Sequence, residues 1–169
     1  VNMVFEQVFA CETQLVQTVD DWARSLDLGK QTDVIVFDFS KAFDLVPHQQ
    51  LLAKLNHYGI RGKNLQWLQS FLLDRKQRVV LNGSSSPWSP VISGVPQGTV
   101  LGPLLFLLYI NNIVDNITSQ VRLFADDCIL YREINTSDDV LALQKDIDSF
   151  ENWANSWQMS LNSKKCHSV

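Results

Sequence analysis

The chain has 169 residues, of which 46% are hydrophobic and 19% charged, and its formal net charge is −4. That length favours one domain, the hydrophobic share allows a buried core and excludes a disordered tail, and the acidic balance argues against a free-standing nucleic-acid binder. Three widely spaced cysteines exclude a disulfide framework, and no apolar run reaches the roughly 18 residues of a membrane span, so we expect an intracellular protein, nuclear or cytoplasmic and not secreted, without a membrane partner.

The first part of the chain predicts a helix, a strand and two further helices. Residues 33–39 are apolar and rich in β-branched side chains, which is typical of a buried strand. Pro47 opens a helix over residues 48–58, and residues 65–72 carry the apolar spacing of another. The first helix is predicted by four apolar residues that recur at helical spacing before Gly29: Leu15, Val19, Trp22 and Leu26.

A β-hairpin follows these helices. Residues 77–81 alternate in polarity up to Asn82-Gly83, which is a strong turn signal. Residues 88–92 form the expected return strand, after a loop that Ser84–Pro87 lengthens. The hairpin starts in the basic run 75–78, which either contacts a phosphate backbone or is a solvated start of the strand.

The next elements are a helix and a second hairpin. Pro103 starts a strongly apolar helix that we expect to end near Ile117. Residues 121–125 and 128–131 predict two strands, and Asp126-Asp127 between them predicts a hairpin with two acids at its tip.

A long helix closes the pattern. Thr136 and Asp139 predict a capping box at its start. Short hairpins interleaved with helices favour an α+β fold with an antiparallel sheet over a doubly wound parallel one. The expected inner face of the long helix consists of Val140, Leu143, Ile147, Phe150 and Trp157.

Three aspartates form a candidate metal site. Asp38 lies at the end of a buried strand, where a carboxylate is costly unless it is paired or binds a metal. Asp126 and Asp127 are adjacent like charges between apolar strands, so they need a compensating cation. If the strands are neighbours, the three carboxylates converge and can hold two Mg²⁺ ions for phosphoryl transfer. Alternatively, Asp126-Asp127 is simply a turn, since Asp favours turns.

Four motifs in one order resemble those of reverse transcriptases, specifically the reverse transcriptase domain of a non-long-terminal-repeat, LINE-like retrotransposon. The resemblance covers nearly everything from Cys11 to the end of the chain. The motifs are the first catalytic motif Phe37-Asp38-Phe39-Ser40-Lys41-Ala42-Phe43-Asp44, the template-gripping loop Ser93-Gly94-Val95-Pro96-Gln97-Gly98, the metal-binding hairpin Phe124-Ala125-Asp126-Asp127, and the lysine motif Leu161-Asn162-Ser163-Lys164-Lys165-Cys166.

The resemblance implies the α+β palm of a right-handed polymerase, in which an antiparallel sheet packs on helices, with partial fingers and no thumb. We expect residues 1–169 to form this single domain as a fragment of a longer polyprotein. The implied activity is that of an RNA-directed DNA polymerase, which transfers a deoxynucleotide to a primer 3′-hydroxyl on an RNA template. The implied partners are the RNA template, the DNA primer and deoxynucleoside triphosphates, and the oligomeric state stays open.

The resemblance also implies the metal ligands. Asp38 and Asp126 would bridge two Mg²⁺ ions, for which Mn²⁺ is an alternative, and Asp127 would be the adjacent, more peripheral acid. The backbone carbonyl of Phe39 would complete a metal shell. One ion would activate the attacking oxygen, and the other would steady the leaving group.

Further residues are implied to bind the substrates. Phe43 would be a steric gate whose ring crowds a ribose 2′-hydroxyl; the alternative is a plain core residue. Lys165 would lie near the leaving pyrophosphate; the alternative is that Lys164-Lys165 is a solvated pair. The floor under the template and the incoming base would be formed by residues that on composition are only a loop: Gly94, Pro96, Gln97 and Gly98.

Two other functions stay open. A catalytically incompetent retrotransposon remnant, or an interaction module, fits a chain in which fingers and thumb motifs are not recognisable. A different two-metal nucleotidyl enzyme, such as a cyclase, fits the carboxylates, although the loop at residues 93–98 and Phe43 argue against it. Dependence on a template distinguishes a polymerase from a cyclase.

Overall fold

The structure is a computed structural model, which describes residues 11–169 and divides into two compact units. Within the described residues, the first unit consists of residues 11–40 and 111–169, and the second of residues 41–110. The helices and strands of the chain form a mixed α+β fold with antiparallel sheets, as the sequence predicts. Among the residues described, no helix is both long and apolar enough to cross a membrane.

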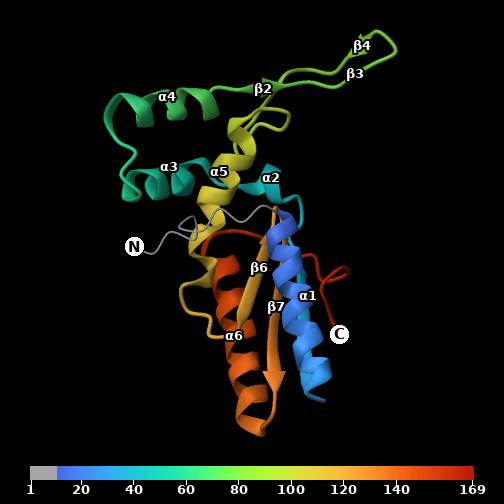
Figure 1. Ribbon diagram of the computed structural model, residues 1–169. Coiled ribbons are helices and arrows are strands. Elements are labelled where there is room, and N and C mark those ends of the chain that lie inside the picture. Colours follow the sequence, from blue (N-terminus) through green and yellow to red (C-terminus); the bar gives the residue numbers. More distant parts are fainter. Residues whose placement is uncertain (1–10) are drawn as a thin grey trace. The chain divides into compact units, whose positions relative to one another are not determined.

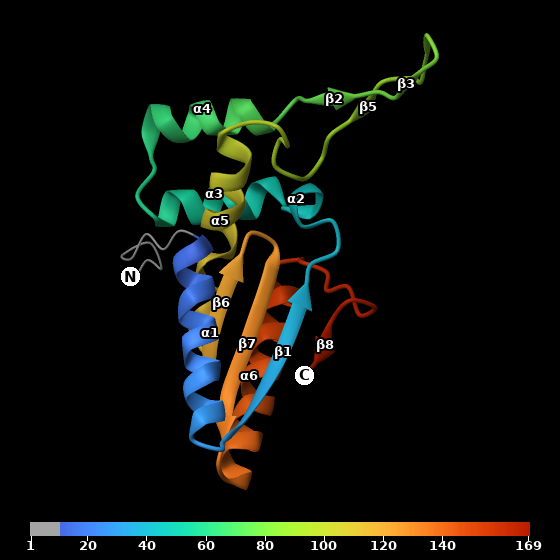
Figure 2. The same cartoon turned by 45° about the vertical axis from the view of Figure 1, so that its right-hand side comes forward.

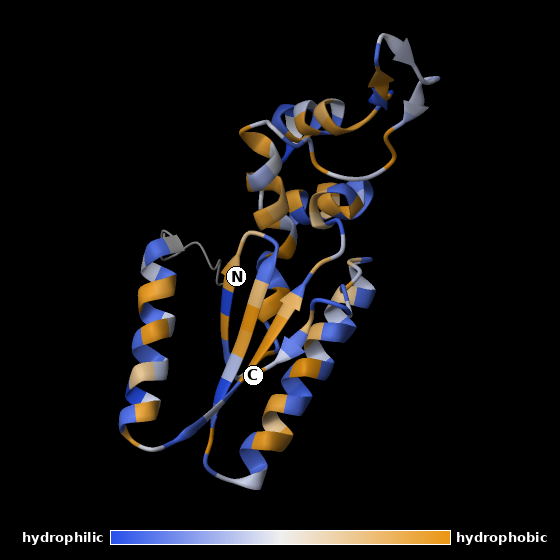
Figure 3. Cartoon of the chain, turned by 90° about the vertical axis from the view of Figure 1, so that its right-hand side faces the viewer, coloured by the Kyte–Doolittle hydropathy of each residue, from blue (hydrophilic) through white to orange (hydrophobic). Residues whose placement is uncertain are grey.

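The first unit is a four-stranded antiparallel sheet with a helix on each face (Figures 2 and 3). The strand order is β6-β7-β1-β8, so the two longest strands, β1 and β7, lie side by side in the middle. Figure 3 shows the sheet between α1 and α6. The elements of this unit are α1 (Cys11–Asp27), β1 (Gln31–Asp38), the 3₁₀ helix η2 (Asn111–Val114), β6 (Gln120–Phe124), β7 (Asp127–Ile134), α6 (Ser137–Ser156) and β8 (His167–Ser168).

Aromatic side chains form the core between the sheet and α6. The rings of Phe37 and Phe150 stack with their centroids 4.0 Å apart, and Phe39 lies 5.9 Å from Phe150. Leu143 and Phe150 are buried as predicted. Val140 is 48% exposed, so the prediction that it lies on the inner face was wrong. Val140 stands in the first turn of α6, beside the capping box of Thr136 and Asp139 that the sequence predicts.

Helix α1 forms where the apolar spacing predicts it, and Gly29 follows with a positive φ of 65°. The apolar stripe behind that prediction is nevertheless largely exposed, since Leu15, Val19 and Leu26 are 57%, 55% and 75% exposed. The helix buries Thr18 instead, whose hydroxyl donates to the Gln14 carbonyl at 2.8 Å. A hydroxyl that bonds to its own helix can be buried at little cost, because its polar atom is satisfied.

The second unit is mainly helical and carries a two-stranded arm (Figure 1). Helices α3 and α4 appear as predicted, and Pro47 precedes α3 as its N-cap. The elements of this unit are α2 (Ala42–Leu45), α3 (His48–His57), α4 (Gly62–Leu72), β2 (Lys76–Gln77), β3 (Val80–Leu81), β4 (Ser84–Ser85), β5 (Ser89–Pro90) and α5 (Leu101–Ile110).

The hairpin returns earlier than the sequence predicts. Asn82 and Gly83 have φ values of 49° and 79°, as a two-residue type I′ turn requires. Ser84 therefore pairs directly with Leu81, and the expected loop at Ser84–Pro87 does not form. The strand pairing then breaks, so the predicted return strand at residues 88–92 is reduced to β5.

Helix α5 differs from its prediction at both ends. It begins at Leu101, before Pro103, because a proline in the first turn leaves no helical hydrogen bond unmade. The Thr99 hydroxyl accepts a hydrogen bond from the Gly102 N–H at 3.0 Å and so satisfies one free donor of this turn. It ends at Ile110 rather than near Ile117, because the following asparagines disfavour helix continuation.

Candidate active site

Two carboxylates face each other at the end of the central strand pair. Asp38 is the last residue of β1, Asp127 is the first of β7, and the two are direct partners in the antiparallel register. Side chains alternate along a strand, and Phe37 and Phe39 pack toward α6, so both carboxylates project from the opposite face of the sheet. Like charges directly opposite each other destabilise a sheet. The stability of the fold therefore does not explain why two aspartates stand at these positions.

A lysine from the C-terminal segment pairs with one of these carboxylates. Lys165 Nζ lies 3.0 Å from Asp38 Oδ2 and donates a hydrogen bond to it. The segment is held in place because the Asn162 N–H donates to the Asp38 carbonyl at 2.8 Å and the Lys165 N–H donates to the Asn162 carbonyl at 2.9 Å. The Lys165 side chain is 66% exposed, so it remains accessible from solvent.

The electrostatics reflect this excess of negative charge. Partial burial raises the pKa of Asp127, and the charges of Asp126 and Asp38 raise it further, while Lys165 opposes them. The hydrogen bond to Asp38, together with its charge, raises the pKa of Lys165. A cation in this position would relieve the repulsion among the acids.

Asp126 lies in the tight turn that joins β6 and β7. Phe124 and Asp127 are the last paired residues of the hairpin, so Ala125 and Asp126 form a two-residue connection. Ala125 has a φ of 55°, which is uncommon for a residue with a side chain. The predicted hairpin is thus present, with Asp126 in the turn and Asp127 already in the strand.

The donor chemistry suits a hard cation, but the side chains do not form a complete ligand set. Carboxylate oxygens are what Mg²⁺ prefers, and Asp38 and Asp127 lie opposite each other. Across residues 11–169, no group of three or more His, Cys, Asp or Glu side chains is placed to hold a metal ion. The Phe39 side chain is buried at 3% exposure; the role of its carbonyl stays a prediction.

In the second unit, the loop at residues 93–98 is bound tightly to the segment 43–48. The Val95 N–H donates to the Phe43 carbonyl at 2.7 Å, and the Gly94 N–H donates to the Val46 carbonyl at 2.8 Å. Gly94 has a φ of 89°, and a Cβ there would lie 2.8 Å from Asp44 Cα. Only glycine allows this approach, which explains one residue of the predicted loop motif physically.

Asp44 and His48 were not predicted as site residues, yet they hold this loop. Asp44 Oδ1 accepts a hydrogen bond from Gln97 Nε2 at 3.0 Å, and its carbonyl accepts one from Ser93 Oγ at 2.8 Å. The buried His48 ring lies 2.8 Å from the Gly94 carbonyl through Nε2. The one sequence signal for Asp44 was its place as the last residue of the first motif.

The remaining predicted loop residues also have defined surroundings. Pro96 is buried and its carbonyl accepts a hydrogen bond from Thr99 Oγ1 at 2.7 Å, while Gly98 is exposed with a φ of 75°. Phe43 is half-buried, and its ring stacks on Phe106 with centroids 4.5 Å apart. This packing agrees with a core role for Phe43, and its role as a gate stays a prediction.

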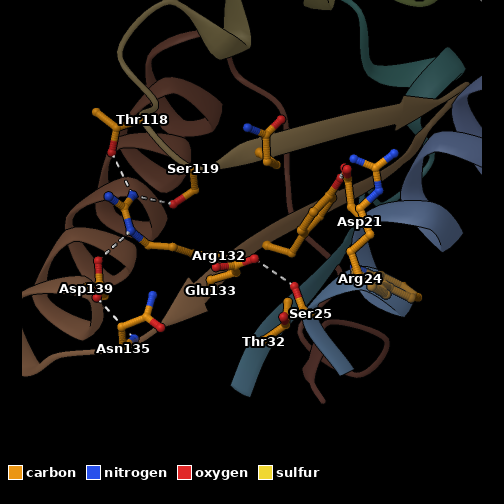
Figure 4. A pocket seen from close by; sticks show the side chains of 13 residues that line it. Asp21, Arg24, Ser25, Thr32, Thr118, Ser119, Arg132, Glu133, Asn135 and Asp139 are labelled. Atoms are coloured by element: carbon orange, nitrogen blue, oxygen red, sulfur yellow. Dashed lines mark hydrogen bonds and ion pairs between the residues drawn. The ribbon is translucent and has the colours of Figure 1, made fainter. Parts of the chain in front are cut away.

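A separate polar cavity of about 410 Å³ opens at the other end of the sheet of the first unit (Figure 4). Its charged side chains have charged or polar partners. Glu133 accepts hydrogen bonds from Ser25 Oγ at 2.8 Å and from Lys30 Nζ at 2.7 Å, and Arg132 donates to Thr118 Oγ1 at 2.9 Å and to Ser119 Oγ at 3.0 Å. The charge of Glu133 is balanced by Lys30, and that of Arg132 by Asp139 and Asp146.

Known proteins resemble this chain in sequence and in fold. The sequence model of the family described as reverse transcriptase (RNA-dependent DNA polymerase) matches residues 4–169. The chain is 33% identical over 144 residues to the RNA-directed DNA polymerase from mobile element jockey of Drosophila melanogaster, and 31% identical over 162 residues to the probable RNA-directed DNA polymerase from transposon X-element of the same organism. These alignments cover 78% and 92% of this chain, but only 15% and 18% of those proteins, so the chain spans less than a fifth of their length.

Two further similarities extend this pattern. The chain is 28% identical over 149 residues to the retrovirus-related Pol polyprotein from type-1 retrotransposable element R2 of Popillia japonica, which covers 83% of this chain and 25% of that protein. Among solved structures, apo telomerase from Candida tropicalis matches with a TM-score of 0.67 and 16% identity, over 96% of this chain and 35% of that one. At this identity the match shows the fold alone.

Proposed function

The chain belongs to the reverse transcriptase family and is related to the polymerases of non-long-terminal-repeat retrotransposons, and we propose that it is the palm, with part of the fingers, of an RNA-directed DNA polymerase. Residues 1–169 form one domain of this polymerase in the proposal. The observation that carries the activity is the pair of opposed carboxylates, Asp38 and Asp127, with Lys165 bonded to the first. A fold does not need this cluster of charge, whereas nucleotidyl transfer does.

The proposed reaction is attack of a primer 3′-oxygen on the α-phosphate of a deoxynucleoside triphosphate, directed by an RNA template. Asp38, Asp126 and Asp127 would hold two Mg²⁺ ions, or Mn²⁺ in their place, with the Phe39 carbonyl as a further ligand. When bound, the ions supply the positive charge that phosphoryl transfer requires. Partial burial raises the pKa of Asp127, and the charges of Asp126 and Asp38 raise it further; this supports the assignment because perturbed carboxyl groups cluster at functional sites.

Lys165 is proposed to act on the leaving group. Its ammonium group is held within 3.0 Å of Asp38 and stays 66% exposed, so it can reach a phosphate near the carboxylates. Its raised pKa keeps it protonated at neutral pH. A protonated amine can neutralise the leaving pyrophosphate or donate a proton to it.

The second unit is proposed to select the nucleotide and to support the template. Phe43 would act as the steric gate, and Gly94, Pro96, Gln97 and Gly98 would form the floor under the template and the incoming base. The backbone hydrogen bonds from Val95 to Phe43 and from Gly94 to Val46 support this assignment, because they tie the loop of the floor to the segment that carries the gate.

The test is primer extension on poly(rA) primed with oligo(dT), with Mg²⁺ or Mn²⁺. The wild-type chain should extend the primer. The Asp126→Asn variant should not, because it lacks one carboxylate of the metal site. Asp115→Asn is the matched control, since it removes one exposed carboxylate outside the site and should leave extension unchanged. Retained activity in Asp126→Asn would refute the metal assignment. A wild-type chain that binds metal without extending the primer would favour a remnant that has lost catalysis.

The gate is tested by the choice of sugar. Phe43→Ala should raise the ratio of UTP to dTTP incorporation at least about tenfold, because removing a clash worth about 1.4 kcal/mol changes selectivity by that factor. Phe71→Ala, which truncates another half-buried ring of the same unit, should leave the ratio unchanged. The ratio is independent of any loss of folded protein, so an unaltered ratio in Phe43→Ala would contradict the gate.

A further inference from the structure

The hairpin of residues 75–92 forms an arm that extends away from α4 (Figure 1). Every residue from Lys76 to Pro90 is exposed. The strand pairings cover only two residues each, between β2 and β5 and between β3 and β4. Because an isolated two-stranded ribbon is marginally stable in water, an arm of this kind is suited to lying against a partner.

The arm carries a bulge that places an aromatic ring beside a cation. Gln77 pairs with Ser89 and Val80 pairs with Ser85. Two residues between these pairs on one strand, 78–79, therefore lie opposite three on the other, 86–88. The extra residue is one of Ser86, Pro87 and Trp88 on the return strand, and bulges re-aim neighbouring side chains. The guanidinium of Arg78 lies over the Trp88 ring, 4.7 Å from its centroid, while the ring remains 60% exposed.

The charge of the arm is opposite to that of the chain. Arg75, Lys76 and Arg78 lie at its base, and no Asp or Glu occurs from residue 75 to residue 114. The chain as a whole has a net charge of −4. The arm of residues 75–92 therefore carries three cationic side chains and no acid, which favours a polyanionic partner.

We propose that the arm binds single-stranded nucleic acid, with its cations on the phosphates and the exposed face of Trp88 stacked on a base. The inference rests on the proposed function for the choice of nucleic acid among polyanions. Cations combined with an exposed aromatic ring are the chemistry of single-strand binding, because every base offers a face for stacking. Pairing with the arm of a second copy would instead oppose three cations to three cations.

The test measures binding of a fluorescein-labelled 20-mer of oligo(rA) to the whole chain by fluorescence anisotropy at several salt concentrations. Lys76→Gln/Arg78→Gln should weaken binding and reduce the slope of log K against log salt by about 1.4, since each phosphate contact to a single strand contributes about 0.7. Trp88→Ala should weaken binding about 5- to 150-fold at every salt concentration, and Trp88→Phe should restore part of the loss.

A matched control separates the arm from general charge. Arg61→Gln/Lys63→Gln removes one arginine and one lysine, both exposed, from the start of α4 and should change neither affinity nor slope. Equal losses in the two double variants, or no binding by the wild type, would overturn the proposal. So would arm variants that abolish self-association in sedimentation while oligo(rA) binding is unchanged, because the arm would then serve a second copy. Binding needs no catalysis, so a chain that binds through the arm without extending a primer refutes only the proposed activity.

Discussion

The two ends of the central sheet in the first unit differ in how their charged side chains are paired. At one end, Asp38 and Asp127 are like charges in direct register, with a mostly exposed Lys165 as the cation bonded to Asp38. At the other end, opposite charges are matched: Lys30 Nζ lies 2.7 Å from Glu133, and Arg132 lies 3.5 Å from the buried Asp146. The same two strands, β1 and β7, run through both regions.

This difference separates charge that supports the fold from charge that serves chemistry. Asp146 is 1% exposed and accepts four hydrogen bonds, from the N–H and the hydroxyl of both Thr118 and Ser119. It therefore fixes α6 to the segment before β6. Asp127 instead has a raised pKa and like-charged neighbours, which costs stability and is expected where an external cation completes the site.

The sharpest test of the comparison replaces one carboxylate at each end. Asp146→Asn should lower the free energy of unfolding by about 3 kcal/mol, because it removes a buried charge from its donors and turns one acceptor into a donor. Asp38→Asn should change it by less than about 1 kcal/mol without metal, since the lost pair with exposed Lys165 is offset by relief of repulsion. Urea unfolding followed by circular dichroism measures both. Equal losses would mean that the carboxylate end also supports the fold.

Most of the fold could be predicted because its signals are local. The strand at Asp38, the helix after Pro47 and the capping box of α6 all depend on residues within one element. The two main errors have different causes, the first local and the second tertiary. The early return at Ser84 follows from the φ values of Asn82 and Gly83, and the exposure of the α1 stripe follows from how that helix lies on the sheet.

The candidate site was predictable only in part. The resemblance to reverse transcriptases indicated Asp38, Asp126, Asp127 and Lys165, and the register of β1 with β7 brings Asp38 opposite Asp127. The hydrogen bond from Gln97 to Asp44 spans residues 53 apart along the chain, and no local pattern encodes such a contact. Asp44 and His48 therefore emerged only once the segments that they join had folded together.

The second test uses pH. Burial alone would raise the pKa of Asp146, but the hydrogen bonds from Ser119 and Thr118 outweigh it and lower that pKa below its ordinary value. A lowered folded-state pKa contributes stability above the ordinary pKa, which is lost as the pH falls through the folded-state pKa. The difference in unfolding free energy between the wild type and Asp146→Asn should therefore shrink as the pH falls below the ordinary pKa of aspartic acid, about 3.9. A constant difference would show that packing, not charge, makes Asp146 important.

The smallest effect is expected on α1, where sequence and structure disagree most. Leu15 and Leu26 are 57% and 75% exposed, so Leu15→Gln/Leu26→Gln removes almost no buried apolar surface and should change the free energy of unfolding by less than about 0.5 kcal/mol. On the same helix, Trp22→Ala removes a ring that meets Tyr131 edge-on with centroids 5.9 Å apart, and should cost about 2 kcal/mol. If the leucine pair cost as much as Trp22, the apolar stripe would be packed in the folded chain. Periodicity would then have identified the buried face of α1 correctly. With the stripe exposed, it did not, because periodicity groups the apolar residues on one side of a helix but does not determine whether that side rests on the sheet.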